Sequence, residues 1–476
     1  MKNKIIFIPE NLDLEQLLKD NPPNFEFDRE YAYIFLYDII KDTNPLIHKI
    51  KDWYNFYRYP NVKKYAIRRN SEVLQKSRPE YARYLEYLVK NKIVWRFPYS
   101  DKVSRSFQLD PKYFGKPLKF VKIIKRKNLN LLNRMNQKKE DFKPLDKWFN
   151  TNLEIDEVSA LKDLNSSLNI KSNYYDYVKT CKTIVNISNG HFNFSRKGYS
   201  DDRLHSEFTR FPKRLRKFLR YDNQVLGEVD ISSSVPFFMY YHFLAIVDNS
   251  KINLKYYQSF FEKPRFYQSA FDKTKSMVKL DPLEVEKFGK TILNGTYYKQ
   301  FIPFFDDDYF VGSAKHDLKR NYDFSEQDKI AILKKRMLSW ANARNKHFLK
   351  EQAVFMQLYP TIYQFIKVFK GRRYLPIEGT LRKKAEKLMS NDKSEVKKVF
   401  QQHKKISHLF LQSESFLMLD VVVRKLNKSK SKIPFFTLHD CIVTTKKNVE
   451  ELNQFMKDTF TSVIGFSPEF KTKIFE

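Results

Sequence analysis

Apolar and polar residues alternate through residues 225–231, and this period predicts a strand with one buried face. Val229 and Ile231 would face a core, while Asp230 would lie on the open face, because successive side chains of a strand point to opposite sides. Pro236 is expected to end the strand. An Asp followed by small hydroxyl residues at a strand end suits a metal ion. Taken alone, however, the pattern is more typical of an edge strand with a solvated Asp.

A second β-rich segment, IPFFTLHDCIVTT at 433–445, has two apolar runs on either side of His439-Asp440. β-Branched and aromatic residues around a short polar pair predict a hairpin with Asp440 at or near its tip. An acidic side chain on a buried hairpin is costly unless a partner compensates its charge. A metal ion is one such partner.

The segment 281–300, DPLEVEKFGKTILNGTYYKQ, has the apolar spacing of a helix. Lys290 and Tyr298 are eight residues apart, a little over two turns, so on one helix they would lie on roughly the same face. A Lys and a Tyr in this arrangement would suit a triphosphate and the sugar and base attached to it. Alone, the pattern is more typical of a solvated helix face.

Nearer the N-terminus, residues 79–91 predict a helix, and 93–97 and 103–109 predict two strands joined by a turn at 98–102. A helix followed by a hairpin is the outline of a winged helix, which is a common nucleic-acid-binding module. An ordinary α+β scaffold has the same outline. Both alternatives place the chain in the α+β class.

The most informative feature of the composition is its charge. The 476 residues include 88 Lys+Arg against 55 Asp+Glu, a formal net charge of +33, and 16% are aromatic. Basic side chains attract phosphate regardless of sequence, and aromatic rings stack on bases, so the composition favours a nucleic-acid partner. An AT-rich genome would also raise Lys, Tyr and Phe, but it would raise Asp and Glu as well.

Other compositional features exclude several classes of protein. Two cysteines, Cys181 and Cys441, are too few for a disulfide framework or a zinc site, so we expect a reducing cytoplasm and no disulfide-linked partner. No apolar segment suggests a signal peptide or a membrane span, so no membrane partner is expected. Only 10 Gly occur, without a glycine-rich phosphate loop, which argues against P-loop and Rossmann nucleotide sites.

A basic segment at 203–219 leads into the first predicted strand. It contains Arg203, His205, Arg214 and Arg216 and has little signal for regular structure. One interpretation is a solvated basic loop. The other is a track for a nucleic-acid backbone beside the predicted metal site.

Two Asp residues on neighbouring strands suit two Mg²⁺ ions, which activate a 3′-hydroxyl and stabilise leaving pyrophosphate. In chain order, Asp230-Ile231-Ser232, Lys290 through Tyr298, and Leu438-His439-Asp440 resemble motifs A, B and C of the DNA polymerase I-like (family A) and single-subunit phage RNA polymerase superfamily. A helix predicted at 404–425 resembles the helix before motif C, which leads with Gln, here Gln412. The ordered set is fairly specific and covers about residues 195–476.

On the nucleotide side, the chain departs from the family pattern at three positions. Val235 stands where family DNA polymerases usually carry a Glu that closes off the ribose 2′ side. Tyr298 is followed by Lys where the family has Gly. The usual motif B Arg is Glu286 here, and the neighbouring Lys287 is the residue that would substitute for it.

Motif C and the N-terminal region also depart from the pattern. Cys441 follows Asp440 where the family often has Glu, so a third carboxylate is missing unless Glu228 serves. Residues 1–190 contain no acidic set resembling a proofreading exonuclease.

The resemblance implies a right-hand polymerase of the α+β class, with a palm of antiparallel strands, helical fingers and a basic N-terminal region, winged-helix-like in one interpretation. The implied segments are 1–140 for nucleic-acid binding, 141–244 for thumb or linker and first palm segment, 245–405 for fingers, and 406–476 for second palm segment.

The resemblance also implies a role for each site residue. The metal ligands would be Asp230, Asp440 and the backbone carbonyl of Ile231, with Mg²⁺ or alternatively Mn²⁺. The nucleotide-binding residues would be Lys290, Tyr298, Val235 and Lys287. The nucleic-acid-binding residues would be Arg203, His205, Arg214, Arg216, Gln412 and His439.

The implied reaction is template-directed transfer of nucleotides from nucleoside triphosphates to a primer 3′-hydroxyl. DNA synthesis is the first expectation, because it prevails in the family. RNA synthesis or priming is the enzymatic alternative. A degenerate polymerase fold that only binds nucleic acid is the third, although Asp230, Lys290 and Asp440 argue against it.

Overall fold

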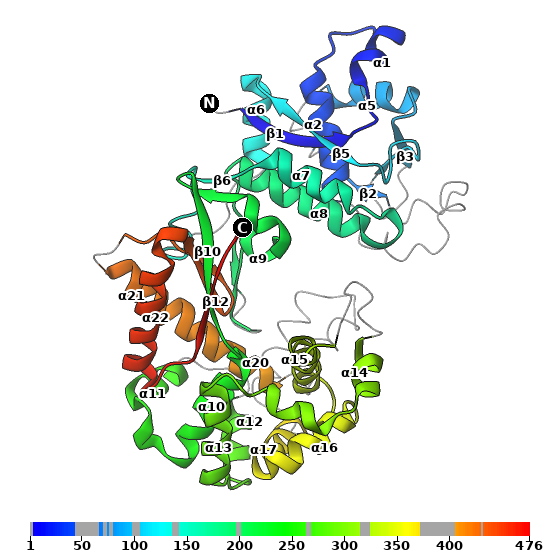
Figure 1. The fold of residues 1–476 in the computed structure, drawn as a ribbon. Coiled ribbons are helices and arrows are strands. Elements are labelled where there is room, and N and C mark those ends of the chain that lie inside the picture. The colour runs from blue at the N-terminus through cyan, green and yellow to red at the C-terminus, as the bar shows by residue number, and fades with distance from the viewer. Residues whose placement is uncertain are drawn as a thin grey trace. The chain divides into compact units, whose positions relative to one another are not determined.

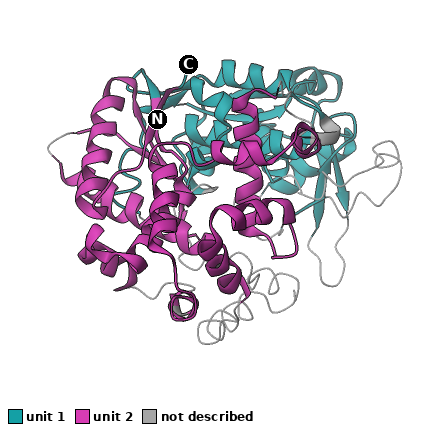
Figure 2. Ribbon diagram, turned by 60° about the horizontal axis from the view of Figure 1, so that its bottom comes forward, with its two compact units in different colours: residues 1–194, 206–226, 475–476 teal, residues 195–205, 227–474 magenta. Residues whose placement is uncertain are grey.

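The computed structural model describes residues 3–42, 66–69, 74–75, 80–97, 105–135, 142–196, 201–262, 268–314, 324–371, 405–429 and 432–476. The chain forms two compact units (Figure 2): unit 1 contains 1–194, 206–226 and 475–476, and unit 2 contains 195–205 and 227–474. Unit 1 runs through the boundary expected between residues 140 and 141, while the four functional segments stay a prediction. The turn predicted at 98–102 lies outside the described residues.

Unit 1 is built around a two-stranded antiparallel sheet in which β1 (Lys4–Pro9) pairs with β5 (Leu118–Ile123), as Figure 1 shows. Helices α2 (Arg29–Ile40) and α8 (Ile170–Ser188) pack against β1, whose residues from Ile5 onward are buried. The remaining elements of unit 1 are α1 (Leu14–Asp20), α6 (Arg126–Met135), β6 (Leu153–Ile155), α7 (Glu157–Ser166), α9 (Glu207–Arg210), the 3-10 helix η3 (Lys213–Phe218) and β9 (Leu219–Tyr221).

The predicted helix and hairpin near the N-terminus are confirmed as elements of unit 1. Helix α5 (Tyr81–Lys90) precedes β3 (Val94–Phe97) and β4 (Ser106–Leu109), which pair antiparallel. A short strand, β2 (Ile67–Arg68), extends the sheet on the other side of β4. The outline fits a winged helix and also a plain α+β scaffold, so nucleic-acid binding by this part stays a prediction.

The sheet of unit 2 contains both predicted β segments. Strand β10 (Gln224–Ile231) begins in unit 1, beside β9, and in unit 2 it lies between β12 (Cys441–Thr445) and β13 (Phe470–Ile474). β11 (Phe436–Leu438) pairs with β12 through the turn His439-Asp440, which confirms the predicted hairpin. With helices around it, the sheet confirms the α+β class.

Helices make up most of the rest of unit 2. Helix α10 (Ser234–Val247) follows β10 and packs against α13 (Pro282–Leu293) and α20 (Lys405–Ser415). The other elements are β7 (Ser195–Arg196), β8 (Leu204–His205), η4 (Asn249–Lys251), α11 (Leu254–Glu262), α12 (Gln268–Lys275), η5 (Lys299–Phe304), α14 (Asp307–Ala314), α15 (Glu326–Asn342), α16 (Leu349–Leu358), α17 (Pro360–Gly371), the π-helix η7 (Phe416–Val422), α21 (Val423–Lys428), η8 (Lys446–Asn448) and α22 (Val449–Ile464).

Among the described residues, the continuous helix Ile406–Lys428 is long and apolar enough to cross a membrane by length and composition. However, 78% of its 18-residue apolar window is buried inside the protein. This is the burial expected of a core helix, and α10 covers part of it.

Candidate active site

Two strand ends meet at the position where the sequence predicts a metal site. Strand β10 ends at Ile231, whose backbone N–H donates a hydrogen bond to the carbonyl of Asp440 at 3.2 Å. Asp440 belongs to the two-residue turn between β11 and β12, where His439 has a φ of +62°. The turn and the end of β10 are therefore neighbours, and Asp230 and Asp440 lie on segments that meet, both partly exposed.

The face of β10 that carries Val229 and Ile231 is buried, as the alternation predicts. Val229 and Ile231 are buried, and a Cβ at Gly227 would lie only 2.8 Å from Ile474 and from Val449, so this face needs glycine for close packing. Asp230 lies on the opposite face, because side chains alternate along the strand. Leu226 and Glu228 on this face are buried, so Asp230, at the end of the strand, is its accessible acidic side chain.

Glu228 lies on the same face of β10 as Asp230 and near the turn His439-Asp440. Its Oε2 atom is 3.8 Å from Sγ of Cys441, within the distance of a weak thiol hydrogen bond, and both side chains are buried. The carboxylate of Glu228 therefore lies beside position 441, where the family often has a Glu. Its service as a third carboxylate stays a prediction.

The donor set at this site consists of hard oxygen atoms. Within the described ranges, no three His, Cys, Asp or Glu side chains are grouped closely enough to hold a metal ion together. Mg²⁺ is commonly held by one or two carboxylates together with substrate phosphates, rather than by a complete protein cage. Asp230 and Asp440 fit that requirement, and the carbonyl of Ile231 is a further oxygen near them.

Glu414 is a residue of this region whose importance sequence reasoning missed. Its side chain is fully buried; Oε1 lies 2.6 Å from Nη2 of Arg203, and Oε2 accepts a hydrogen bond from the Ser234 hydroxyl at 2.5 Å. Burial raises the pKa of the Glu414 carboxyl, Arg203 opposes this shift, and the negative charge of Asp440 adds to it. The only sequence signal was its place two residues after Gln412 in the helix predicted at 404–425.

The predicted nucleic-acid contacts near Asp440 fall into two groups by burial. Gln412 is fully buried, whereas His205 and His439 are partly exposed and their rings lie 5.6 Å apart, edge to face. Burial, with the neighbouring charges of Arg203 and His205, lowers the pKa of His439 to about 4, so its imidazole is neutral at pH 7. A neutral His beside Asp440 is suited to hydrogen bonding rather than to charge pairing.

The basic segment 203–219 is more ordered than a solvated loop, because it contains α9 and η3. Arg203 belongs to unit 2 and pairs with Glu414. In unit 1, Nη1 of Arg214 lies 3.3 Å from Asp163, and the buried guanidinium of Arg216 lies 5.8 Å from the ring centre of Phe475. These arginines have protein partners, and their contact with a nucleic-acid backbone stays a prediction.

The prediction that Lys290 and Tyr298 share one helix face is wrong. Helix α13 begins with Asp281 as N-cap and ends at Leu293; Gly295 then turns the chain with a φ of +73°. Lys290 is exposed in the last turn of the helix, whereas Tyr298 is buried beyond it and precedes η5. Burial, and secondarily the charge of Asp440, raises the pKa of the Tyr298 hydroxyl.

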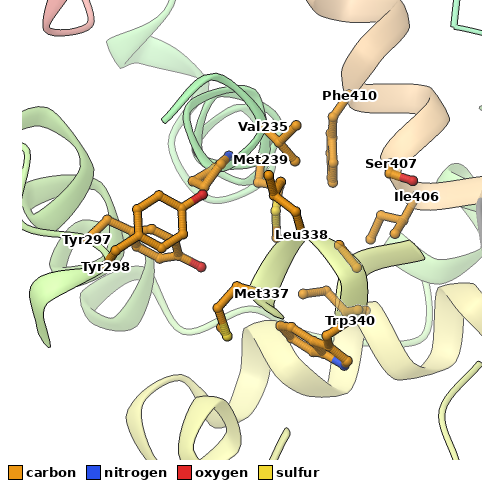
Figure 3. A pocket seen from close by; sticks show the side chains of 13 residues that line it. Val235, Met239, Tyr297, Tyr298, Met337, Leu338, Trp340, Ile406, Ser407 and Phe410 are labelled. Carbon is orange, nitrogen blue, oxygen red and sulfur yellow. The ribbon is translucent and has the colours of Figure 1, made fainter. Parts of the chain in front are cut away.

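Tyr298 and Val235 line the same small apolar cavity, together with Met239, Met337 and Phe410 among others (Figure 3). The cavity volume is about 20 Å³, which is room for roughly one water molecule. A sugar or base does not fit inside it. These side chains are therefore suited to contact one side of a nucleotide rather than to enclose it. Sequence reasoning placed both residues at the nucleotide, and the structure brings them together.

The prediction that Pro236 ends strand β10 is also wrong. The strand ends at Ile231, and a turn with Ser233 in the left-handed region, φ +55°, leads into α10 at Ser234. Pro236 lies in the first turn of α10, where backbone N–H groups have no intrahelical acceptor and its missing N–H costs little. Val235 is therefore a helix residue, whose orientation depends on the start of α10.

The second predicted nucleotide-binding lysine, Lys287, is exposed on α13, and its ammonium group lies 5.5 Å from the ring centre of Tyr359. Tyr359 is buried and donates a hydrogen bond to Gln300. Lys287 and Lys290 are thus both exposed cations of the same helix.

No family model matches the sequence, and no curated protein matches it. One solved structure to which the chain is similar is the POL domain of Pol1 from M. smegmatis in complex with DNA primer-template and dNTP. The sequence identity is 10%, the match covers 67% of this chain and 54% of that chain, and the TM-score is 0.27. The chain therefore spans about half the length of that structure.

Proposed function

We propose that this protein is a template-directed nucleic-acid polymerase, with its active centre at the junction of β10 and the β11–β12 turn. The observation that carries the proposal is the hydrogen bond from the Ile231 amide to the Asp440 carbonyl. It joins two acidic segments that are far apart in the sequence, each at the end of a strand. Nucleotidyl transfer needs carboxylates brought together in this way.

Asp230 and Asp440 would hold Mg²⁺, with the carbonyl of Ile231 as an additional oxygen ligand and Mn²⁺ as an alternative ion. When bound, the metal would lower the pKa of the primer 3′-hydroxyl and offset the charge that develops on the phosphates. Neutral His439 beside Asp440 is suited to donate or accept a hydrogen bond at the primer end without adding charge.

The incoming nucleoside triphosphate would be bound by α13 and by the wall of the small cavity. Lys290, and Lys287 on the same helix, would offset the charge of the triphosphate as point charges. Tyr298 and Val235 would lie against the sugar and base. The exposure of both lysines supports this assignment, because a bound triphosphate needs accessible cations.

We favour DNA as the product, made on a primer–template substrate. The compartment we favour is the cytoplasm. Both cysteines are free, which fits a reducing compartment. RNA synthesis remains the alternative because Val235 offers no carboxylate beside the sugar.

The test is primer extension with dNTPs and NTPs in parallel, with and without template, by wild type and by Asp230→Asn and Asp440→Asn. Each substitution removes a charge from the site, so extension should fall by several orders of magnitude, while duplex binding persists through the Lys and Arg surface. Asp458→Asn, at an exposed position of α22, is the matched control and should leave extension unchanged. Near-normal extension by either site variant would remove the proposal.

A further inference from the structure

Two lysines of the C-terminal strand lie opposite the carboxylates of β10. The antiparallel register of β10 and β13 pairs Asp230 with Lys471 and Glu228 with Lys473. Residues directly opposite each other in antiparallel strands point to the same face of the sheet, with Cβ atoms about 4.5–5.5 Å apart. Lys471 and Lys473 therefore lie on the face of the sheet that carries Asp230 and Glu228.

Both lysines of β13 are accessible to solvent. Phe470 is buried, whereas Lys471, Thr472 and Lys473 are exposed, so the strand register rather than burial assigns the lysines to the face of Asp230. The two lysines are two residues apart, so along an extended strand they are separated by about 6.5 Å. They form a short row of cations that starts level with Asp230 and continues away from the end of β10.

A row of exposed cations beside an acidic site has two physical explanations. The lysines can neutralise Asp230 and Glu228 across the strands, which would stabilise the sheet. Alternatively, they can bind phosphate oxygens of a ligand. Glu228 is buried beside Cys441, whereas Lys473 is exposed. An ion pair with Glu228 therefore does not explain why Lys473 is exposed to solvent, which favours the second explanation.

We propose that Lys471 and Lys473 bind consecutive phosphodiester groups of the nucleic-acid strand whose 3′ end reaches Asp230. This inference rests on the proposed function for the identity of that strand. The row runs along β13 rather than converging on one point, which suits a repeating backbone. A nucleoside triphosphate presents the same phosphate chemistry, and Lys290 and Lys287 are the cations assigned to it.

The experiment measures binding of a fluorescein-labelled primer–template duplex by anisotropy, without nucleotide, between about 50 and 200 mM salt. It compares Lys471→Gln, Lys473→Gln and the double variant, each in the Asp230→Asn background, which keeps chemistry out of the measurement. Each lost phosphate contact should reduce the slope of log K against log salt by about 0.7–0.9. Lys457→Gln is the control, because this exposed lysine lies on α22, the helix that packs on the other face of the sheet.

The arginine variants Lys471→Arg and Lys473→Arg keep the charge and should retain the wild-type slope. An unchanged slope in the double glutamine variant overturns the proposal. The same double variant is also made in the protein that keeps wild-type Asp230, and there a change confined to the KM for nucleotide overturns the proposal as well. Thermal unfolding of the same variants tests the structural explanation. A lower Tm with an unchanged slope would mean that the lysines stabilise the sheet and do not bind phosphate. Loss of slope in a protein that extends no primer would keep this inference and remove the proposed polymerase function.

Discussion

The guanidinium of Arg203 makes two contacts with one oxygen of Glu414: Nη2 lies 2.6 Å and Nε lies 2.8 Å from Oε1. Glu414 is fully buried and Arg203 is mostly buried, so each charge depends on the other. Removing one partner of a buried ion pair leaves an uncompensated charge, which costs about 3–5 kcal/mol. The pair lies beside Ser234 and within the field of Asp440, so its integrity matters to the candidate active site.

Arg203→Ala should therefore lower the free energy of unfolding by about 3–5 kcal/mol, measured by chemical denaturation at pH 7. Arg214→Ala is the matched control, because the Arg214–Asp163 pair is considerably more exposed and should contribute at most about 1 kcal/mol. Replacing Arg203 and Glu414 together by Met should cost less than Arg203→Ala, since no buried charge remains. Equal losses of unfolding free energy in Arg203→Ala and Arg214→Ala would contradict this account.

The sequence predicts the local part of this site well and the tertiary part poorly. Strand β10 and the His439-Asp440 turn follow from alternation and from a polar pair between apolar runs, which are short-range signals. The break after α13 was missed because apolar spacing outweighed the turn signal of Asn294-Gly295. Glu414 was not recognised, because its significance depends on Arg203 and Ser234, which come from other elements.

His242 should make the stability of the protein depend on pH. Its ring is fully buried on α10, hydrogen-bonded to Ser413 at 2.6 Å and to Tyr257 at 3.2 Å. Burial lowers the pKa of His242 from 6.5 to about 3, so the folded protein keeps the ring neutral while the unfolded chain protonates it below about pH 6.5. Stability from this group is thus present above that pH and is lost as the pH falls, by up to about 1.4 kcal/mol per pH unit.

The measurement compares wild type with His242→Gln, which keeps hydrogen-bonding capacity without titrating, by denaturation at a series of pH values from about 7.5 down to 4. Shifts from other groups cancel in the difference between the two curves. The variant should lose less stability than wild type on acidification. Parallel curves would show that His242 does not couple to folding in this range.

Lys290→Ala should weaken nucleotide use far more than duplex binding. The side chain is exposed at the end of α13, and loss of a charge-assisted contact worth about 1.5–3 kcal/mol corresponds to a rise of about 10–150-fold in the KM for nucleotide. Lys279→Ala, an exposed lysine shortly before α13, is the control for a general change in charge. If Lys290→Ala instead lost nucleic acid and kept its nucleotide KM, Lys290 would belong to the backbone-binding surface.

Sugar selection should be weak, because the residue expected beside C2′ is small. Val235 lies in the first turn of α10 and cannot accept a hydrogen bond, whereas a Glu at this position would reach further. Tyr298 lines the same cavity, and in the proposed arrangement its ring would still crowd the sugar, so some discrimination should remain. We expect dNTPs to be favoured over rNTPs by about 10–100-fold in kcat/KM, a difference of roughly 1.4–2.7 kcal/mol in the transition state.

The measurement is kcat/KM for one matched dNTP and rNTP pair with wild type and Val235→Glu. The longer, charged side chain should raise the ratio, because it fills the space beside C2′ and opposes the added hydroxyl. Val235→Leu enlarges the side chain without charge and separates bulk from electrostatics: an increase in both variants points to bulk, and an increase in Val235→Glu alone points to the carboxylate. Wild-type rejection of rNTPs by more than about 10⁴-fold would place the sugar gate elsewhere, whereas preference for rNTPs would favour RNA synthesis.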